Sequence, residues 1–521
     1  MSGRISLARA FAVVGGWTMA SRILGFARDA VMAALLGAGP MAEAFFVAFR
    51  LPNLFRRFFA EGAFNMAFVP LFAKRLEDGS GAKGFAEEAL SGLFFILLVL
   101  TVIAMVAMPV LMLGLAAGFS DEPDKFDLAV LYGRIQFPYL LCMSLTALFS
   151  GVLNSMGKFA APAAAPVALN IILISFMALA AAFAAPIGDF LALGVLAAGF
   201  CQVALVAYAA RKAGMQLRVR RPRWTPAMKR LTALGVPGMI AGGTTQINLF
   251  IGTSIATFFT GAVAWLSYAD RIYQLPLGVV GVAIGVVLLP ELSRRVRADD
   301  DEGARSSFNR AAEFSLALTL PAAVALIVMP GPIVDVLFGR YAFTPADVAA
   351  TGAAVMIFAI GLPAFVLQKV LQPVYFARED TKTPLKFAVI SMVVNTIISA
   401  GGAWYMGYLA IPIGTVIASW LQVLLLWRGA RAFGDAAAPD AQLLTRMPRL
   451  ILASIVMGVA VWFGVDLLAD ALATSGLRWA ALLALVAVGG AIYGVTALAL
   501  GAASIADLKA GMRRTPQSIP R

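Results

Sequence analysis

Long apolar runs recur along the whole chain, and short connections between them hold most of the polar residues. Each run has roughly 20 residues or more, the length of an α-helix that crosses the hydrocarbon core of a bilayer. The fourteen segments lie at residues 9–36, 44–73, 87–116, 128–156, 163–185, 189–210, 231–259, 263–291, 311–331, 347–376, 384–404, 408–428, 449–469 and 478–502. The pattern predicts an all-α polytopic membrane protein with about fourteen transmembrane helices.

Lysine and arginine gather in every second connection, beginning with the one after the second segment. The richest basic connection holds Arg211, Lys212, Arg218, Arg220, Arg221, Arg223, Lys229 and Arg230. The connection at residues 117–127, by contrast, has four acidic residues and only Lys125 as a cation. Because basic loops stay in the cytoplasm, the alternation predicts cytoplasmic N and C termini in an inner membrane, with residues 507–521 as a basic tail.

Composition narrows the functional classes further. The chain is 61% hydrophobic and 13% charged, which excludes a soluble protein. Its net charge of +13 is explained by the basic connections, so we expect no nucleic-acid partner. Histidine is absent, and Cys142 and Cys201 both lie in apolar runs. A metal site and a Ser-His hydrolase are therefore not expected.

Two segments of the first half reappear in the second half. FVPLFAKRLEDG from Phe68 resembles LLPELSRRVRADD from Leu288. A second match pairs Pro138 with Pro363 and, in the same register, Asn170 with Asn395, both 225 residues apart. Shared composition of apolar helices is the alternative explanation, but the common register favours duplication. We therefore expect two six-helix lobes, residues 1–216 and 217–436, in a pseudo-twofold arrangement, with two further helices in residues 437–506.

Ionisable residues interrupt the first, second and eighth segments. They are Arg22, Arg28, Asp29, Arg50, Arg56, Arg57, Glu61, Asp270 and Arg271. Each arginine at bilayer depth costs on the order of 3 kcal/mol on insertion scales, so a water-filled cavity is the expected environment. Snorkelling to the interface or internal pairing is the alternative, above all for Arg57 and Glu61, which are four residues apart.

The arginines outnumber the nearby carboxylates, so a net positive cavity is expected. Guanidinium groups bind phosphate and diphosphate through pairs of hydrogen bonds, and a low-dielectric cleft strengthens them. The sequence therefore predicts an anionic, phosphate-bearing substrate that is moved rather than chemically converted.

Three longer motifs resemble a known family. SRILGFARDA from Ser21, followed by AEAFFVAFRLPNLFRRFFAEGAFNMAFVPLF from Ala42, is similar to the signature of the MurJ (MviN) family of lipid II flippases. YADRIYQLPLGVVGVAIGVVLLP from Tyr268 and DTKTPLKFAVI from Asp380 also resemble that family. The resemblance covers essentially the whole chain.

The family resemblance implies the fold of the multidrug/oligosaccharidyl-lipid/polysaccharide exporter superfamily, with the last two helices forming a groove for the lipid tail. It assigns the essential substrate-binding arginines to Arg22, Arg28, Arg56 and Arg271. It assigns supporting cavity charges to Asp29, Glu43, Glu61 and Asp270, beside Arg50 and Arg57. Gln274 stands where some relatives have glutamate.

The resemblance also bears on cofactors. Some members bind sodium, but the residue one turn after Asn395 is Ser399 rather than an acid, so a sodium site is an alternative that the sequence does not support, and no metal ligands are predicted. No cofactor is expected, and the membrane potential is the expected energy source.

The function that follows is a transporter, not an enzyme. It would flip lipid II, the undecaprenyl-pyrophosphate-linked peptidoglycan precursor, from the cytoplasmic to the periplasmic leaflet of a bacterial inner membrane by alternating access. Expected partners are lipid II and membrane lipids, with cell-wall synthesis and division machinery as candidate protein partners. The rivals are an exporter of drugs or another lipid-linked oligosaccharide, an enzyme acting on polyprenyl pyrophosphate, and a structural component of a division complex. An enzyme would need clustered carboxylates or histidine near the arginines.

Overall fold

The computed structural model describes residues 7–59, 63–79, 81–435 and 437–502. Within these ranges the chain consists of α-helices and short 3₁₀ helices and has no strand. The first helices are α1 (Leu7–Leu36), α2 (Pro40–Phe59), α3 (Ala63–Glu77), α4 (Ala82–Val106), α5 (Met108–Leu115), η1 (Ala117–Asp121), α6 (Pro123–Gln136), α7 (Tyr139–Ser155), α8 (Ala160–Ala182), α9 (Ile187–Lys212) and α10 (Pro226–Ala256).

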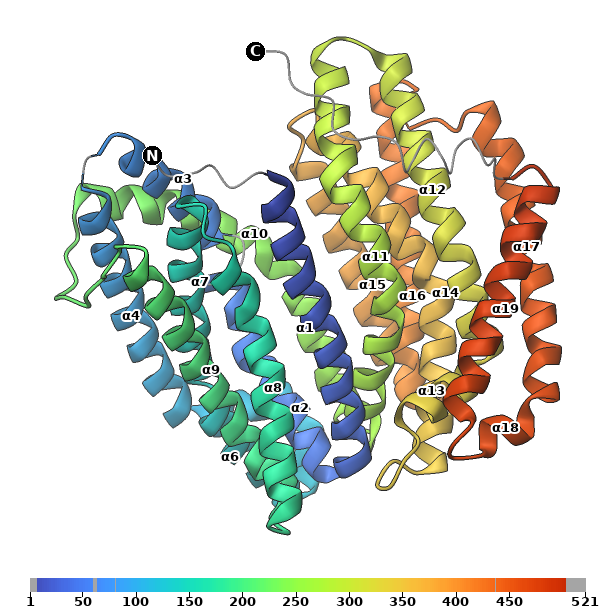
Figure 1. The fold of residues 1–521 in the computed structure, drawn as a ribbon, viewed down its shortest axis with the longest axis horizontal. Helices are drawn as coiled ribbons and strands as arrows, with labels where there is room; N and C mark the ends of the chain where they lie inside the picture. The colour runs from blue at the N-terminus through green and yellow to red at the C-terminus, as the bar shows by residue number, and fades with distance from the viewer. Residues whose placement is uncertain (1–6, 60–62, 80, 436, 503–521) are drawn as a thin grey trace. The chain divides into compact units, whose positions relative to one another are not determined.

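The remaining helices follow with short connections (Figure 1). They are α11 (Ala262–Arg297), α12 (Asp301–Val328), α13 (Pro330–Phe338), α14 (Pro345–Phe376), α15 (Lys382–Met406), η2 (Gly407–Leu409), α16 (Ala410–Gly429), η3 (Ala430–Phe433), α17 (Ala441–Leu467), α18 (Ala469–Ala473) and α19 (Arg478–Ala499).

Each predicted transmembrane segment coincides with one helix or with two consecutive helices. The second segment corresponds to α2 and α3, and the fourth corresponds to α6 and α7, which meet at Pro138. Within the described residues, nine stretches are long and apolar enough to cross a membrane, and one of them, Lys382–Phe433, contains both α15 and α16. The predicted class, an all-helical multi-span membrane protein, is confirmed.

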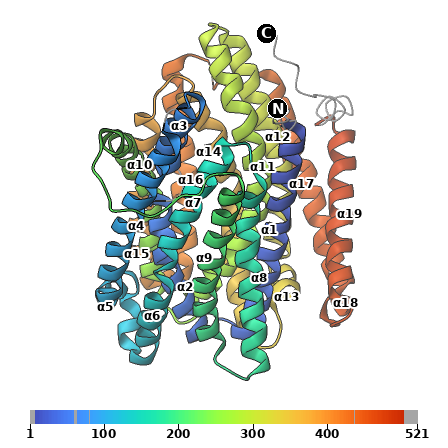
Figure 2. The same ribbon diagram turned by 60° about the vertical axis from the view of Figure 1, so that its left-hand side comes forward.

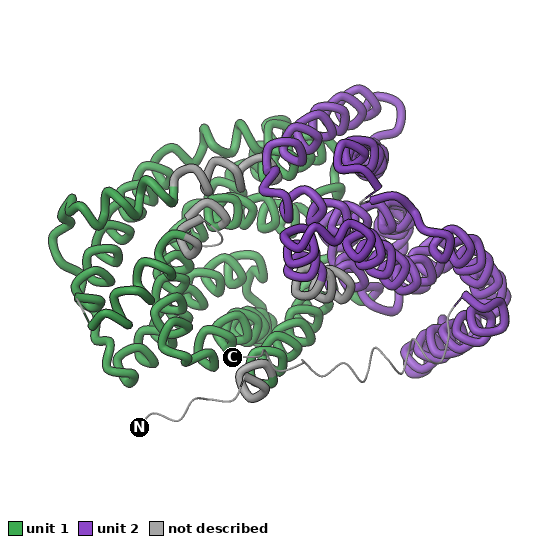
Figure 3. The backbone as a smooth tube through the Cα atoms, turned by 90° about the horizontal axis from the view of Figure 1, so that it is seen from above, with its two compact units in different colours: residues 1–264, 340–344 green, residues 265–339, 345–521 purple. Residues whose placement is uncertain are grey.

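The backbone divides into two compact units (Figure 3). Unit 1 comprises residues 1–264 and 340–344, and unit 2 comprises residues 265–339 and 345–521. This division differs from the repeat boundary expected at residues 216 and 217, because α10 packs against α2 and α3 inside unit 1. Packing density and sequence duplication are different properties, so the lobe limits taken from the repeat stay a prediction.

In unit 1, the first helix, which carries charged residues, packs beside a pair of apolar helices. Helix α1 packs along α8, and α8 in turn packs against α9 (Figure 2). Helix α9 also lies close to α7 at Gly199, where an added Cβ would come within 2.8 Å of the Tyr139 ring and 2.9 Å of Cys142 Cβ. A small residue at this position permits the two helices to approach closely, as is common between membrane helices.

Unit 2 is built around α12, α14 and α16. Helix α14 packs against both α12 and α16, and α15 covers α16. A buried cluster that includes Phe308, Val370, Tyr375 and Leu426 fills the space between these helices. The Tyr375 hydroxyl donates a hydrogen bond of 2.5 Å to the Leu426 carbonyl, so the one polar atom of this large buried side chain is satisfied.

Helices α17 and α19 correspond to the two spans that the repeat leaves over, and they attach to unit 2 through α12. Leu450 and Ala453 of α17 form a buried cluster with Ala497 of α19 and Ala502. The Tyr493 hydroxyl of α19 donates to the Ala317 carbonyl of α12 at 2.6 Å.

A cluster of charged side chains connects the start of α17 to α12. Glu313 accepts hydrogen bonds from Arg310 and, at 2.5 Å, from Arg446. Asp440 pairs with Arg310 at 2.5 Å and accepts the Leu443 N–H at 2.7 Å, which makes it the N-cap of α17. Burial alone would raise the pKa of Asp440, but the Leu443 N–H and the Arg310 guanidinium outweigh it and hold that pKa below its ordinary value of 3.8.

This depressed pKa predicts an acid-sensitive contribution to stability. The contribution of Asp440 is fully present above its unfolded pKa and is lost as the pH falls through the lower folded pKa. We expect Asp440→Asn to lower the thermal unfolding midpoint of the purified protein at neutral pH, and the gap from wild type to close below pH 3.8. Asp440→Ala should be less stable than Asp440→Asn by about 1 kcal/mol, because asparagine keeps the helix cap. Equal midpoints at neutral pH, or a gap that widens in acid, would contradict this role.

Candidate functional site

Helix α1 presents the first group of predicted substrate-binding charges. Arg22 is exposed, whereas Arg28 is mostly buried, with 12% of its side chain accessible. The next residue, Asp29, is buried. Serine and glycine residues near Arg22 and Arg28 keep this part of the helix narrow, so α8 can pack closely along it.

Arg28 is held on two sides. Its Nε and one terminal nitrogen donate to Asp29 Oδ1 at 3.0 and 2.7 Å, and its other terminal nitrogen donates to Asn170 Oδ1 of α8 at 2.9 Å. The Asn170 side-chain amide then donates to the Ser21 carbonyl at 3.0 Å. Gly25 leaves room for this amide, because a Cβ there would lie 3.5 Å from Asn170 Nδ2.

The contact between Arg28 and Asp29 changes the charge balance that the sequence suggests. In this structure the Arg28 guanidinium is neutralised by an adjacent carboxylate, and Asn170 sets its direction. Asn170 is a candidate site residue that the sequence pattern alone does not identify. In the sequence, Asn170 stands out only through its repeat match to Asn395, and that match does not indicate which residue Asn170 contacts.

Helix α2 carries the second group. Arg50 and Arg56 are half-buried, and they lie on either side of Pro52, which is inside the helix. The Asn53 side-chain amide donates to the Phe49 carbonyl at 2.9 Å, one turn back from the proline-interrupted stretch. The side chain of Arg57 and the whole of Glu61 lie outside the described residues, so their predicted pairing is not placed.

Glu43, which the family resemblance assigns to the cavity charges, is instead fully buried in unit 1. Its Oε2 lies 2.6 Å from Lys125 Nζ, and its Oε1 accepts the Val263 N–H at 3.2 Å. Lys125 is 3% exposed and also lies 4.2 Å from the centre of the Phe119 ring. The pair connects the start of α2 to the start of α6 and to the first turn of α11. Glu43 therefore serves as a structural carboxylate here, and its partner could not be found from local spacing.

Unit 2 contributes Asp270 and Arg271 on α11. Arg271 is exposed and Asp270 is half-buried. The Gln274 amide, one turn further on, donates a hydrogen bond to Asp270 Oδ2. Glutamine thus serves as a neutral donor to Asp270, where a glutamate would place a second negative charge beside it.

The second repeat-related asparagine, Asn395 of α15, is also buried. Its Oδ1 accepts a hydrogen bond of 3.1 Å from Ser399, and Gly414 of α16 lies so close that a Cβ would come within 2.7 Å of the same oxygen. Within the described residues, no group of three Cys, Asp or Glu side chains could hold a metal ion. The two repeat-related asparagines therefore have different partners: Asn395 contacts a serine hydroxyl, whereas Asn170 contacts an arginine.

The chain is similar to known proteins along most of its length. Residues 32–481 match the family model described as "Lipid II flippase MurJ". A Rhizobium meliloti protein named "Probable lipid II flippase MurJ" is 48% identical, over 98% of this chain and 97% of that protein. The "Lipid II flippase MurJ" of Burkholderia cenocepacia is 34% identical, over 89% of this chain and 91% of its own length.

Solved structures show the same fold. One described as "Lipid II flippase MurJ, inward closed conformation" superposes with a TM-score of 0.76 at 24% identity, covering 93% of this chain and 98% of that chain. An inward-facing multidrug resistance MATE transporter of the MOP superfamily gives a TM-score of 0.66 at 16% identity, over 82% of this chain and 98% of that chain.

The buried pair of Glu43 and Lys125 predicts a strong stability effect. Lys125→Met leaves a fully buried carboxylate without its cation, which costs about 3–5 kcal/mol. We therefore expect a large fall in the thermal unfolding midpoint of the purified protein. The double variant Glu43→Gln with Lys125→Met should recover most of the loss, because no unpaired charge remains.

Asp124→Asn, at an exposed position in the same first turn of α6, is the control and should change the midpoint little. If Lys125→Met behaves like Asp124→Asn, the pair has no structural importance.

Proposed function

The chain belongs to the MurJ family of lipid II flippases, and from this premise we propose that it translocates lipid II from the cytoplasmic to the periplasmic leaflet of the bacterial inner membrane. The observation that carries the proposal is the 48% identity over nearly the whole chain, which includes the charged first two helices. The transported molecule is then an undecaprenyl-pyrophosphate-linked peptidoglycan precursor, and the reaction is movement across the bilayer without covalent chemistry.

The proposed binding residues for the diphosphate are Arg22, Arg28 and Arg56 of unit 1 and Arg271 of unit 2. Arginine suits this substrate because its planar group gives two parallel hydrogen bonds to phosphate oxygens. Arg28 is already oriented by Asn170, so less side-chain entropy is lost when it takes up a phosphate oxygen.

Release of the head group needs a competitor for the arginines. Asp29 is placed for this task, because its Oδ1 lies 2.7 Å from the Arg28 guanidinium. We propose that the diphosphate displaces Asp29 from part of the guanidinium on binding, and that Asp29 regains it on release. Alternating access between the two lobes would expose the site to each side in turn.

The energy source in this proposal is the membrane potential, negative inside. It favours outward movement of negative charge by about 2.3 kcal/mol per charge per 100 mV. The basic connections give the proposed orientation, with both termini in the cytoplasm and the acidic connection at residues 117–127 in the periplasm. Membrane lipids, and proteins of cell-wall synthesis and division, remain proposed partners.

The arginine assignment predicts a defined loss of function. In cells depleted of their native flippase, wild type should restore growth and lipid II translocation. Arg22→Ala and Arg271→Ala should not, at equal membrane abundance, because a lost charged hydrogen bond to phosphate costs about 1.5–3 kcal/mol. Arg223→Ala, in an exposed basic connection, is the matched control and should rescue. Full rescue by both cavity variants would remove these arginines from the proposed site.

The role of Asn170 gives an independent test. Asn170→Ala removes the hydrogen bond that orients Arg28 and should reduce lipid II translocation about tenfold, as expected for one charge-assisted hydrogen bond. Asn154→Ala, at an exposed position of the same unit, should leave translocation unchanged. Asn170→Asp should be at least as defective as Asn170→Ala, because it adds a second carboxylate beside Arg28. Normal translocation by Asn170→Asp would show that the charge on Arg28 is not used.

A further inference from the structure

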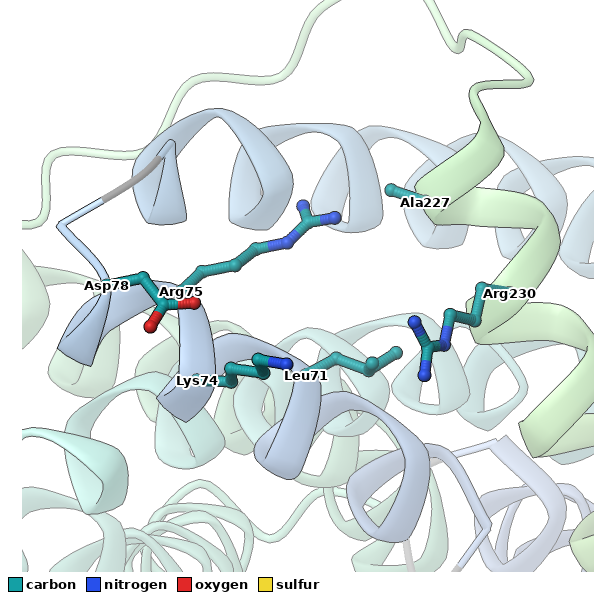
Figure 4. Close-up of a pocket in the computed structure, with 6 residues that line it drawn as sticks. All are labelled: Leu71, Lys74, Arg75, Asp78, Ala227 and Arg230. Atoms are coloured by element: carbon teal, nitrogen blue, oxygen red, sulfur yellow. The ribbon is translucent and has the colours of Figure 1, made fainter.

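A pocket in unit 1 lies between the end of α3 and the start of α10 (Figure 4), and its lining includes none of the arginines proposed to bind the substrate. Its volume is about 210 Å³, and it is lined by Leu71, Lys74, Arg75, Asp78, Ala227 and Arg230. Three of these six residues are cations and only one is an acid, so the pocket carries a net positive charge. The proposed orientation places it at the cytoplasmic end of the helices.

The acids of the neighbouring α4 are used elsewhere and do not neutralise the pocket. Glu87 pairs with Arg220 at 3.0 Å, and Glu88 accepts a hydrogen bond of 2.8 Å from the Thr225 hydroxyl. Within the described part of the chain, the structure gives Lys74 and Arg230 no carboxylate oxygen within salt-bridge distance. The Arg75 guanidinium is positioned 4.2 Å from the centre of the Phe85 ring.

The internal repeat supplies a comparison within the same chain. Lys74 and Arg75 correspond to Arg294 and Arg295 at the end of α11. Those two arginines are paired with Glu291 at 2.6 and 2.7 Å. The residue that corresponds to Glu291 in the first copy is Leu71.

The two copies therefore differ at the position one turn before the two cations, where the second copy has a carboxylate and the first copy has an apolar side chain. In the second copy Glu291 neutralises the cations one turn later on its own helix, as pairs at this spacing do. In the first copy Leu71 leaves both cations open toward the pocket and adds an apolar wall. An apolar wall beside open cations suits a molecule that has both a phosphate and a hydrocarbon part.

We propose that this pocket binds the phosphate of an anionic phospholipid headgroup from the cytoplasmic leaflet. Basic pockets between membrane helices on the cytoplasmic side bind such headgroups, and each nearby cation adds about 1 kcal/mol. Trp224, 63% exposed and just before α10, is the kind of residue that sits at the level of lipid headgroups. A bound phosphate would join Lys74 and Arg75 of α3 to Arg230 of α10, and so hold the seventh span against α3 within unit 1.

The test is lipid binding by the purified full-length protein, measured by native mass spectrometry with phosphatidylglycerol and phosphatidylcholine. Leu71→Glu copies the second repeat into the first without removing any cation, and it should abolish the preference for phosphatidylglycerol. Lys74→Gln with Arg230→Gln should weaken phosphatidylglycerol binding about fivefold for each charge removed. Should Leu71→Glu fail to fold, this second variant, whose substitutions are at exposed positions, decides the question.

The matched control is Arg294→Gln with Arg297→Gln, which removes two exposed cations from the second copy and should retain binding. An equal loss in the control and the pocket variants would indicate a diffuse basic surface and overturn the proposal. Inorganic phosphate is the second probe, and its binding is measured by the thermal stabilisation of the protein. Stabilisation by phosphatidylglycerol but not by phosphate at the same concentration supports a lipid site, and an equal response to both overturns it. This readout does not depend on lipid II translocation.

Discussion

The structure depends on one constraint, which is that an ionised side chain inside a membrane protein needs a partner or water. The cost of an isolated buried charge is several kcal/mol, which is comparable with the whole stability of a domain. The described charges of unit 1 follow this constraint in two ways. Lys125 and Glu43 satisfy each other in full burial, and Arg28 is shared between Asp29 and Asn170. Exposed Arg22 remains accessible for an anion.

The same constraint separates structural charges from those available for transport. Glu43, Lys125, Glu313 and Asp440 join helices that are distant in sequence, and their role is to fix the packing. Arg28 differs, because its carboxylate partner Asp29 is the next residue on the same helix. Separating the two side chains of such a pair disturbs the helix packing little, so a diphosphate can compete for the guanidinium. We see this difference as the physical basis for moving an anion through an apolar medium.

Much of the fold followed from the sequence because bilayer thickness fixes the length of each apolar run. The helical segments, including the extra pair at α17 and α19, lie where the runs predict. The breaks within segments, such as the one between α6 and α7, were not predicted, because the apolar pattern continues through Pro138. Contacts between residues that are far apart in the sequence could not be predicted either. Lys125 is the lone cation of an acidic connection, and nothing in its local sequence identifies Glu43 as its partner. The same holds for Asn170 and Arg28.

The central claim is that Arg22 and Arg271 face water and bind a diphosphate, and cysteine accessibility tests it most directly. Arg22→Cys and Arg271→Cys would be made in a background in which the native Cys142 and Cys201 are replaced by alanine. Each variant would then be treated with a charged, membrane-impermeant methanethiosulfonate, with and without lipid II. The account predicts rapid modification at both positions, slowed by lipid II but not by undecaprenol, which has no phosphate. Modification only by membrane-permeable reagents, with no protection by lipid II, would place these side chains in lipid and contradict the account.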